Sequence, residues 1–231
     1  MKKIRDTKGF TIVELMIAIS ILSVILLMST VVLESVGNLF SKGLNMANVQ
    51  NDSRNIILNV VSSIQFSNSV LNNGVSSPET TINGEKIYAY CFGETRYSYV
   101  LGFPPTGWQH ILWVDKMINT SGCTPLNISQ ASPSCSGIKN CISSQSNSGS
   151  ELTGKNMHLA IFQVQPIPND QGLFGIGVGL AFGDKDLFIT DTSGKNPKLV
   201  NNEDYQCNTA VGDEFCATSY LTTLAAERLI Q

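Results

Sequence analysis

Apolar positions fill the first part of the chain almost without interruption. Between Phe10 and Leu33 the only charged residue is Glu14, and the other polar side chains are those of Thr and Ser. A helix of these 24 residues would extend roughly 36 Å at about 1.5 Å per residue, which exceeds the ~30 Å hydrocarbon core of a bilayer. The pattern predicts a membrane-spanning helix over residues 10–33.

After Leu33 apolar residues recur at spacings of three and four, which is typical of a helix with one buried face. The members of this stripe are Val36, Leu39, Phe40, Leu44, Ala47, Ile57, Val60, Val61 and Ile64. We expect the helix to run to about Leu71, where Asn72-Asn73-Gly74 would end it. Residues 34–72 would then form an amphipathic half that packs on a domain made of residues 73–231.

Short runs of alternating polarity follow, and they predict antiparallel β-strands. The expected strands are Lys86–Phe92, Thr95–Leu101, Gln109–Val114, His158–Val164 and Gly172–Phe182. The expected fold class is therefore α+β, with a long N-terminal helix packed on an antiparallel β-sheet. The final segment, Ser219–Gln231, fits either a short helix or a last strand.

The run Gly172–Phe182 differs between its two faces. Phe174, Ile176, Val178, Leu180 and Phe182 share one face, and Gly175, Gly177 and Gly179 share the other. A face floored by glycine lets another backbone approach closely, so we expect it to pack against the long helix or a neighbouring element. The spaced glycines of a nucleotide-binding loop would require a helix N-terminus to hold phosphate, which this pattern lacks.

All six cysteines lie beyond the apolar run, which predicts up to three disulfides in an oxidising compartment. We expect Cys207 to pair with Cys216 because only eight residues separate them. The other four, Cys91, Cys123, Cys135 and Cys141, allow three pairings, of which Cys91–Cys123 with Cys135–Cys141 is preferred. The competing interpretation, a zinc site, lacks a C-x-x-C pair and suitably spaced histidines.

Three of these cysteines belong to a Ser-rich insertion, Asn119–Gly154. It contains too few large apolar residues to hold a shape by core burial, so cross-links are its expected restraint.

The charge distribution predicts how the chain lies in a membrane. Four basic residues against Asp6 give residues 1–9 a net charge of +3, which keeps the N-terminus in the cytoplasm and sends the rest outward. The net charge of −3 includes that leader, so the chain without it carries −6. No basic run follows Lys8, which argues against nucleic acid as a partner.

No catalytic set, metal site or cofactor site is predicted. His110 and His158 lie in strand-like runs, where structural roles are expected. Asp184, Asp186 and Asp191 could bind calcium, but a solvated turn is favoured because they do not match the twelve-residue loop pattern. The aromatic segment Tyr88–Trp113 could form a ligand-stacking surface, although its alternation favours sheet core.

The start of the apolar run carries a distinctive arrangement. A small residue, Gly9, precedes the span, so a cut between Gly9 and Phe10 would remove the basic leader and leave the helix with a free amine. Glu14 would then lie one turn from that amine, where an unpaired carboxylate costs roughly 2.5–3.5 kcal/mol on insertion scales. Such a charge requires a partner.

The segment Gly9-Phe10-Thr11-Ile12-Val13-Glu14-Leu15-Met16-Ile17-Ala18 resembles the cleavage and methylation signature of type IV prepilins and of the related pseudopilins of type II secretion. The resemblance is detailed over residues 1 to about 35. It implies that a prepilin peptidase cuts between Gly9 and Phe10, that Phe10 becomes N-methylated, and that Glu14 pairs with the N-terminal amine of a neighbouring subunit during assembly.

The resemblance implies a non-enzymatic structural subunit that inserts in the membrane and then enters a helical surface filament. Its implied partners are the prepilin peptidase, other pilin subunits, and an assembly platform with its ATPase. A pseudopilus or a DNA-uptake fibre is the alternative within the family, and a membrane-anchored binding module that never polymerises is the alternative outside it. The large insertion and extended C-terminal region favour a minor, tip-located subunit over the bulk pilin.

Overall fold

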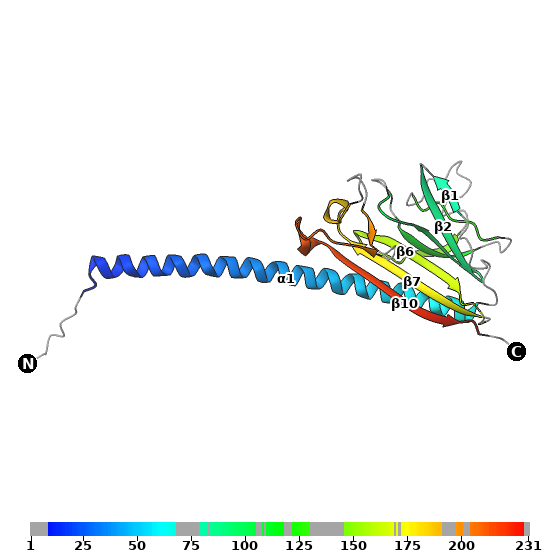
Figure 1. The fold of residues 1–231 in the computed structure, drawn as a ribbon, viewed down its shortest axis with the longest axis horizontal. Helices are drawn as coiled ribbons and strands as arrows, with labels where there is room; N and C mark the ends of the chain where they lie inside the picture. The colour runs from blue at the N-terminus through cyan, green and yellow to red at the C-terminus, as the bar shows by residue number, and fades with distance from the viewer. Residues whose placement is uncertain are drawn as a thin grey trace, which may run out of the picture. The chain divides into compact units, whose positions relative to one another are not determined.

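The computed structural model describes residues 9–67, 79–82, 84–104, 108, 110–117, 122–129, 146–168, 170, 172–190, 197–200 and 204–228. The contacts divide the chain into two units, Met1–Ser41 and Lys42–Gln231. The first unit contains the beginning of the long helix α1, and the second contains its remainder with all the β-strands (Figure 1).

Helix α1 runs from Ile12 to Phe66, 55 residues, without a break at Gly37 or Gly43. Its first part buries no side chain, and its length and composition suffice to cross a membrane. The prediction of a long apolar N-terminal helix is therefore confirmed.

The last turns of α1 bury one face. Val49, Ser53, Ile56, Ile57, Val60 and Ile64 are buried, at the spacings of three and four that the amphipathic pattern requires. The helix ends five residues earlier than predicted, because the backbone N–H and the hydroxyl of Ser67 both donate to Ile64 O at 3.4 and 3.0 Å. Leu71 and Asn72-Asn73-Gly74 lie outside the described residues.

Five antiparallel strands form the larger sheet in chain order: β1 (Glu79–Ile82), β2 (Glu85–Phe92), β3 (Thr95–Val100), β4 (Leu112–Met117) and β5 (Ser146–Glu151). The strand expected at 109–114 begins later, at Leu112, and His110 precedes it instead of lying within it. Glu151 explains this boundary, because its Oε1 accepts the backbone N–H groups of Ile111 and Leu112 at 3.3 and 2.9 Å.

The smaller sheet has the order β10-β7-β6, all antiparallel. Its strands are β6 (Met157–Pro166), β7 (Leu173–Phe182) and β10 (Ala217–Ala226). The segment beginning at Ser219, for which helix and strand were both open, is therefore mainly strand. The short pair β8 (Leu199–Val200) and β9 (Asp204–Tyr205) and two 3₁₀ turns, Lys185–Leu187 and Asp213–Phe215, lie between β7 and β10.

The glycine face of β7 packs against a neighbouring element, which is the second of the two possibilities that the sequence left open. The opposite face, with Ile176 and Val178, belongs to the core that contains α1. Gly177 is instead covered by a neighbouring strand: a Cβ there would lie 3.2 Å from the hydroxyl of Tyr220 on β10. The missing side chain makes room for a ring from the adjacent strand of the same sheet.

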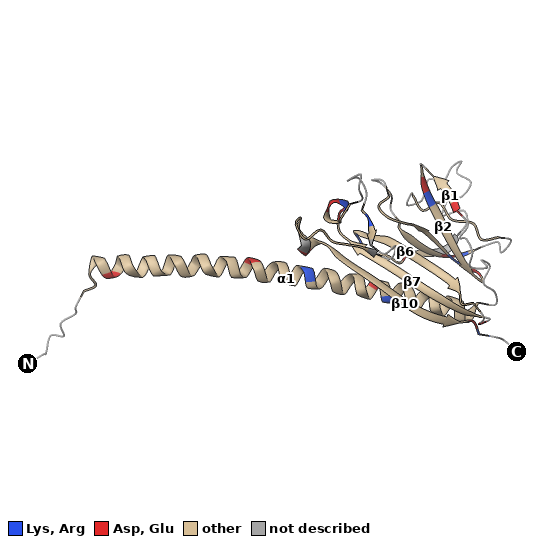
Figure 2. Ribbon diagram, viewed as in Figure 1, with Lys and Arg blue, Asp and Glu red and all other residues tan. Residues whose placement is uncertain are grey.

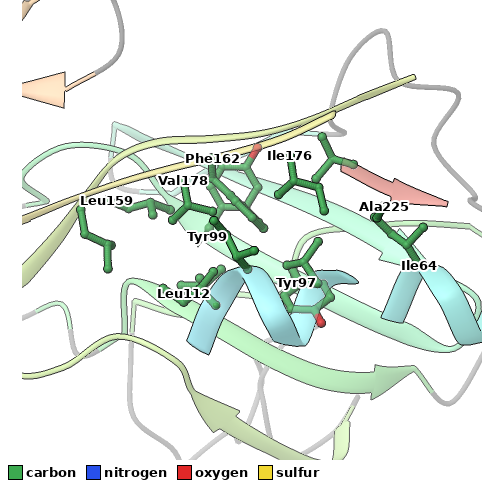
Figure 3. Packing of buried hydrophobic residues seen from close by; sticks show 14 of the residues in the cluster. Ile64, Tyr97, Tyr99, Leu112, Leu159, Phe162, Ile176, Val178 and Ala225 are labelled. Atoms are coloured by element: carbon green, nitrogen blue, oxygen red, sulfur yellow. The ribbon is translucent and has the colours of Figure 1, made fainter. Parts of the chain in front are cut away.

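One core joins α1 to both sheets within the second unit. Figure 3 shows Ile64 of α1 among Tyr97, Tyr99 and Leu112 of the larger sheet and Phe162, Ile176 and Ala225 of the smaller one. The rings of Tyr99 and Phe162 meet edge to face at 4.9 Å. The tyrosines of the aromatic segment are thus core residues, as the alternation favoured.

The Ser-rich insertion uses core burial, contrary to expectation. Leu126 and Ile128 are fully buried against Ile87 and Val100, on the second face of the larger sheet. The insertion also supplies β5, which pairs with β4. Two apolar side chains suffice here because the sheet provides a ready apolar surface for them.

Two disulfides lie within the described residues, Cys91–Cys123 and Cys207–Cys216. They are the pairs expected from the sequence, and they exclude these four cysteines as zinc ligands. Cys135 and Cys141 lie outside the described residues.

Candidate functional site: the N-terminal cap and the exposed helix

Thr11 and Glu14 cap the N-terminus of α1 reciprocally. The backbone N–H and the hydroxyl of Thr11 each donate to Glu14 Oε2 at 3.0 Å, and the N–H of Glu14 donates to Thr11 Oγ1 at 3.3 Å. This Thr-x-x-Glu arrangement is a capping box, which satisfies N–H groups that have no partner within the helix. Thr11 and Glu14 thus determine that the helix begins at Ile12.

The predicted cleavage residues precede this cap. Phe10 is 83% exposed, and no atom lies within 4 Å of the position that a Cβ on Gly9 would take. Neither residue belongs to the helix, which starts at Ile12. The Gly9–Phe10 bond therefore lies in open, non-helical chain.

The hydroxyl groups of the apolar half bind its own backbone. Ser20 donates to Ile17 O and Ser23 to Ser20 O, each at 2.8 Å. Ser29 and Thr30 donate in the same way to Ile25 O and Leu27 O. These bonds satisfy the donors without water, as a hydrocarbon environment demands.

The apolar side chains of this half are exposed on every side of the helix. Leu27 and Leu33, for example, are 68% and 70% exposed. Figure 2 shows charged residues only at isolated points along α1. A surface of this kind needs lipid or other apolar helices as its surroundings.

Outside the helix, the predicted candidate residues do not assemble into a site. His158 in β6 stacks on Phe103 at 4.1 Å, and burial lowers its pKa. His110 Nδ1 lies 3.1 Å from Glu151 Oε2, in the group of bonds that fixes the start of β4. Asp184 and Asp186 belong to the turn at Lys185–Leu187, and Asp191 lies outside the described residues.

No cluster of metal-binding side chains occurs in the part of the chain that the structure describes. Asp184 and Asp186 lie at a 3₁₀ helix, which agrees with the turn that the sequence favoured for them.

The sequence analysis missed a buried ion pair. Arg96 on β3 and Asp115 on β4 form two hydrogen bonds, at 3.0 and 2.6 Å, with almost no exposure of either side chain. Arg96 also donates to Thr124 O at 3.1 Å. The pair thus anchors the buried part of the insertion beside the Cys91–Cys123 disulfide. Its only sequence signal was a pair of opposite charges, Arg96 in one predicted strand and Asp115 directly after the next.

Comparison with known proteins identifies the N-terminal segment. Residues 4–30 match the model of the prokaryotic N-terminal methylation motif. This segment contains the Gly9–Phe10 junction, the capping box and most of the exposed apolar half. No curated protein and no solved structure matches the chain.

Proposed function

We propose that this chain, which by its N-terminal methylation motif belongs to the type IV pilin and pseudopilin family, is a structural subunit of a helical surface filament. The observation that carries the proposal is the motif at residues 4–30 on a helix whose first part buries none of its side chains. Such a helix requires lipid before assembly and the helices of other subunits afterwards. The work of the chain is then structural.

Processing by a prepilin peptidase occurs between Gly9 and Phe10 and leaves a methylated amine on Phe10. The open, non-helical chain around this bond supports the assignment, because a peptidase binds an extended substrate. Cleavage leaves the capping box intact, since Thr11 and Glu14 both follow the cut.

Glu14 pairs with the Phe10 amine of a neighbouring subunit during assembly. Both hydrogen bonds from Thr11 go to Glu14 Oε2, so Oε1 remains for an incoming ammonium group. The carboxylate can therefore cap its own helix and bind a neighbour at the same time. Pairing also removes the cost of a lone charge among apolar helices.

The orientation follows from the basic leader, with the N-terminus in the cytoplasm and the disulfide-bonded domain outside. The subunit then uses an assembly platform with its ATPase as its machinery. We assign it to a minor, tip-located position. This is supported by β5 and by the segment 122–129 with its buried Leu126 and Ile128, which enlarge the domain beyond four strands of the larger sheet.

Mass spectrometry of the surface form tests the proposal. We expect the mature chain to begin at methylated Phe10, and Gly9→Val to accumulate as an uncut precursor. Gly37→Val is the matched control, because Gly37 has equally open surroundings in mid-helix and should leave cleavage unchanged. A surface form that begins at Met1 would contradict the proposal and favour an anchored binding module that does not polymerise.

Incorporation assays test the role of Glu14. Glu14→Leu should insert in the membrane normally but enter sheared filaments poorly beside wild-type subunits. Glu34→Leu, at another exposed position of α1, should enter filaments normally.

An antibody to residues 119–154 distinguishes the three kinds of subunit. Sparse or terminal labelling of filaments agrees with a minor pilin, and labelling along the whole shaft agrees with a bulk pilin. Short periplasmic fibres agree with a pseudopilin.

A further inference from the structure

A segment between β7 and β10 covers the face of the smaller sheet that points away from the α1 core. We call it the strap, and its described residues are 184–190, 197–200 and 204–216. Ala160 and Ala181 are buried with strap residues on this face, whereas their neighbours Leu159 and Leu180 belong to the core that contains α1. The strap therefore shields a second, separate apolar surface of the sheet.

The strap is bonded to itself, and its two ends meet. Its backbone hydrogen bonds join its own parts, as in the bond from Ile189 N–H to Gln206 O at 2.8 Å. The Cys207–Cys216 disulfide closes its last part. A Cβ on Gly183 would lie 2.7 Å from Phe215 O, so the strap leaves the sheet and returns to it at one place. A segment built in this way can open locally as one unit.

Four stacked rings connect the strap with the sheet. The ring centroids of Phe188 and Tyr205, both in the strap, lie 5.3 and 5.2 Å from that of Phe103. The ring of Phe103 stacks in turn on His158 of β6, with 4.1 Å between the centroids. The imidazole of His158 is therefore the base on which the aromatic contacts of the strap rest.

His158 is the member of this stack that can gain a charge near neutral pH. Its Nδ1 is buried and has no hydrogen-bond partner among the described residues. When the neutral ring carries its proton on Nε2, Nδ1 is only an unused acceptor, but in the protonated ring it becomes a donor on a cation. A buried charge with an unpaired N–H is costly, and a cation over the face of Phe103 compensates only in part.

The charged groups around His158 reduce this cost without removing it. Asp184, at the start of the strap, favours the protonated ring, but burial has the larger effect and lowers the pKa of His158. Lys185 and Asp186 follow in the same turn and are exposed, as is Asp184. Tyr205 contributes a phenol, and neither β6 nor β7 contains an Asp, Glu, Lys or Arg.

We propose that the strap is an acid-sensitive device: protonation of His158 breaks the ring stack, and the strap lifts from Ala160 and Ala181 while the sheets and the α1 core stay folded. The pivot is the place where Gly183 adjoins the end of the strap. In the open form the imidazole is solvated and its pKa returns to about 6.5, above its value in the closed form. The open form therefore binds the proton more readily, so closure is complete above about pH 6.5 and is lost as the pH falls below it.

The second histidine of the chain provides a comparison, because its surroundings are the opposite. His110 Nδ1 lies 3.1 Å from Glu151 Oε2, so protonation of His110 turns this contact into an ion pair. With two histidines in the chain, an opening of the strap in mild acid is assigned to His158. The proposal requires neither cleavage nor polymerisation, so it stands or fails apart from the filament assignment.

Methyl NMR of the full-length chain in detergent, with ¹³C-labelled alanine, tests the proposal. Between about pH 7.5 and 4.5, a soluble paramagnetic agent should come to relax the Ala160 and Ala181 methyl groups at least about fivefold faster. The methyl group of Ala225, buried in the α1 core, should stay shielded. The midpoint of the change should coincide with the titration of the His158 Cε1–H signal and lie below about pH 6.5.

Two variants assign the effect. His158→Phe keeps an aromatic ring against Phe103 but cannot bind a proton, so it should stay closed over the whole range. His110→Gln is the control, which keeps a donor for Glu151 and should open as wild type does. Methyl groups of Ala160 and Ala181 that stay shielded in acid, opening of His158→Phe, or exposure of Ala225 at the same pH would each overturn the proposal. In wild type alone, a His158 signal that titrates apart from the methyl change would also overturn it.

Discussion

The two parts of α1 belong to the same helix but have different surroundings. From Ile12 to Ser41 no side chain is buried, and hydroxyl groups bind their own backbone. From Lys42 onward Val49, Ile56, Val60 and Ile64 are fully buried in the core of the second unit. The second part obtains its stability from specific packing, whereas under the proposed function the first part depends on an apolar environment, so the same substitution should have different consequences in each.

A buried charge should separate the two parts most clearly. Ile56→Asp places a carboxylate in a site with no exposed surface, which should destabilise the domain by at least about 4 kcal/mol. Leu22→Asp, at a 55% exposed position, should leave the domain as stable as wild type but oppose membrane insertion by about 3 kcal/mol. Urea unfolding in detergent, followed by tryptophan fluorescence, and a membrane-extraction assay measure the two effects. Equal unfolding midpoints for the two variants would refute the contrast.

An alkaline titration should detect the contact between the buried part of α1 and the larger sheet. Tyr97 donates to Asn59 Oδ1 at 2.8 Å and lies 2.7 Å from the hydroxyl of Ser63, both on α1. Burial raises the pKa of Tyr97 from 10.0 to about 12. The folded state therefore retains the phenolic proton longer than the unfolded state does. The resulting stability is complete below pH 10 and is lost as the pH rises to 12, by up to about 3 kcal/mol.

The Tyr97→Phe variant checks the origin of that loss. It should be about 1–2 kcal/mol less stable than wild type at pH 7, because Asn59 and Ser63 lose a hydrogen-bond partner. Its free energy of unfolding should then change less between pH 10 and 12. An unchanged alkaline loss in Tyr97→Phe would assign the effect to another group.

Serine to alanine should have a different effect in each part of α1. Ser53 is fully buried and its hydroxyl has no hydrogen-bond partner among the described residues. Ser53→Ala should therefore raise the free energy of unfolding by about 1 kcal/mol. The matched change Ser23→Ala removes only a bond to the backbone at an exposed position and should leave the domain unaffected. A destabilised Ser53→Ala would reveal a partner for this hydroxyl.

The smallest effect concerns Asp52, at the margin of the buried part. Its pKa is raised by desolvation, although a bond from the Gly154 backbone opposes the shift. A raised folded pKa stabilises the fold at low pH, and this contribution is lost as the pH rises through that pKa. Asp52→Asn should therefore reduce the loss of stability between about pH 4 and 6, by less than about 1 kcal/mol because the carboxyl is largely solvated. Unfolding curves at these pH values measure it, and an unchanged slope would contradict it.

Elements defined by a local pattern could be predicted from the sequence. The spacings from Val49 to Ile64 determine the buried face of α1, and the alternation from Tyr88 to Phe92 determines the two faces of β2. Cys207 and Cys216 pair across a short separation of 9 in sequence. The methylation motif is likewise contained within residues 4–30.

Elements that depend on distant partners could not be predicted. Strand β5 forms because β4 offers an edge, so its own sequence, SNSGSE, carries little signal. Leu126 and Ile128 are buried because the larger sheet is apolar on both faces, which no local window shows. Gly177 of β7 accommodates Tyr220, whose position depends on a register set far along the chain.

The composition of the core determines when folding can finish during export. Val49 and Ile64 of α1 share their cluster with Ala217 and Ala225 of β10, the last strand in the chain. In a chain that crosses the membrane from its N-terminus, the helical stripe emerges long before the strand that completes its surroundings. Until β10 follows, the stripe and one edge of β7 remain uncovered, and exposed apolar surface and an unpaired strand edge of this kind favour aggregation.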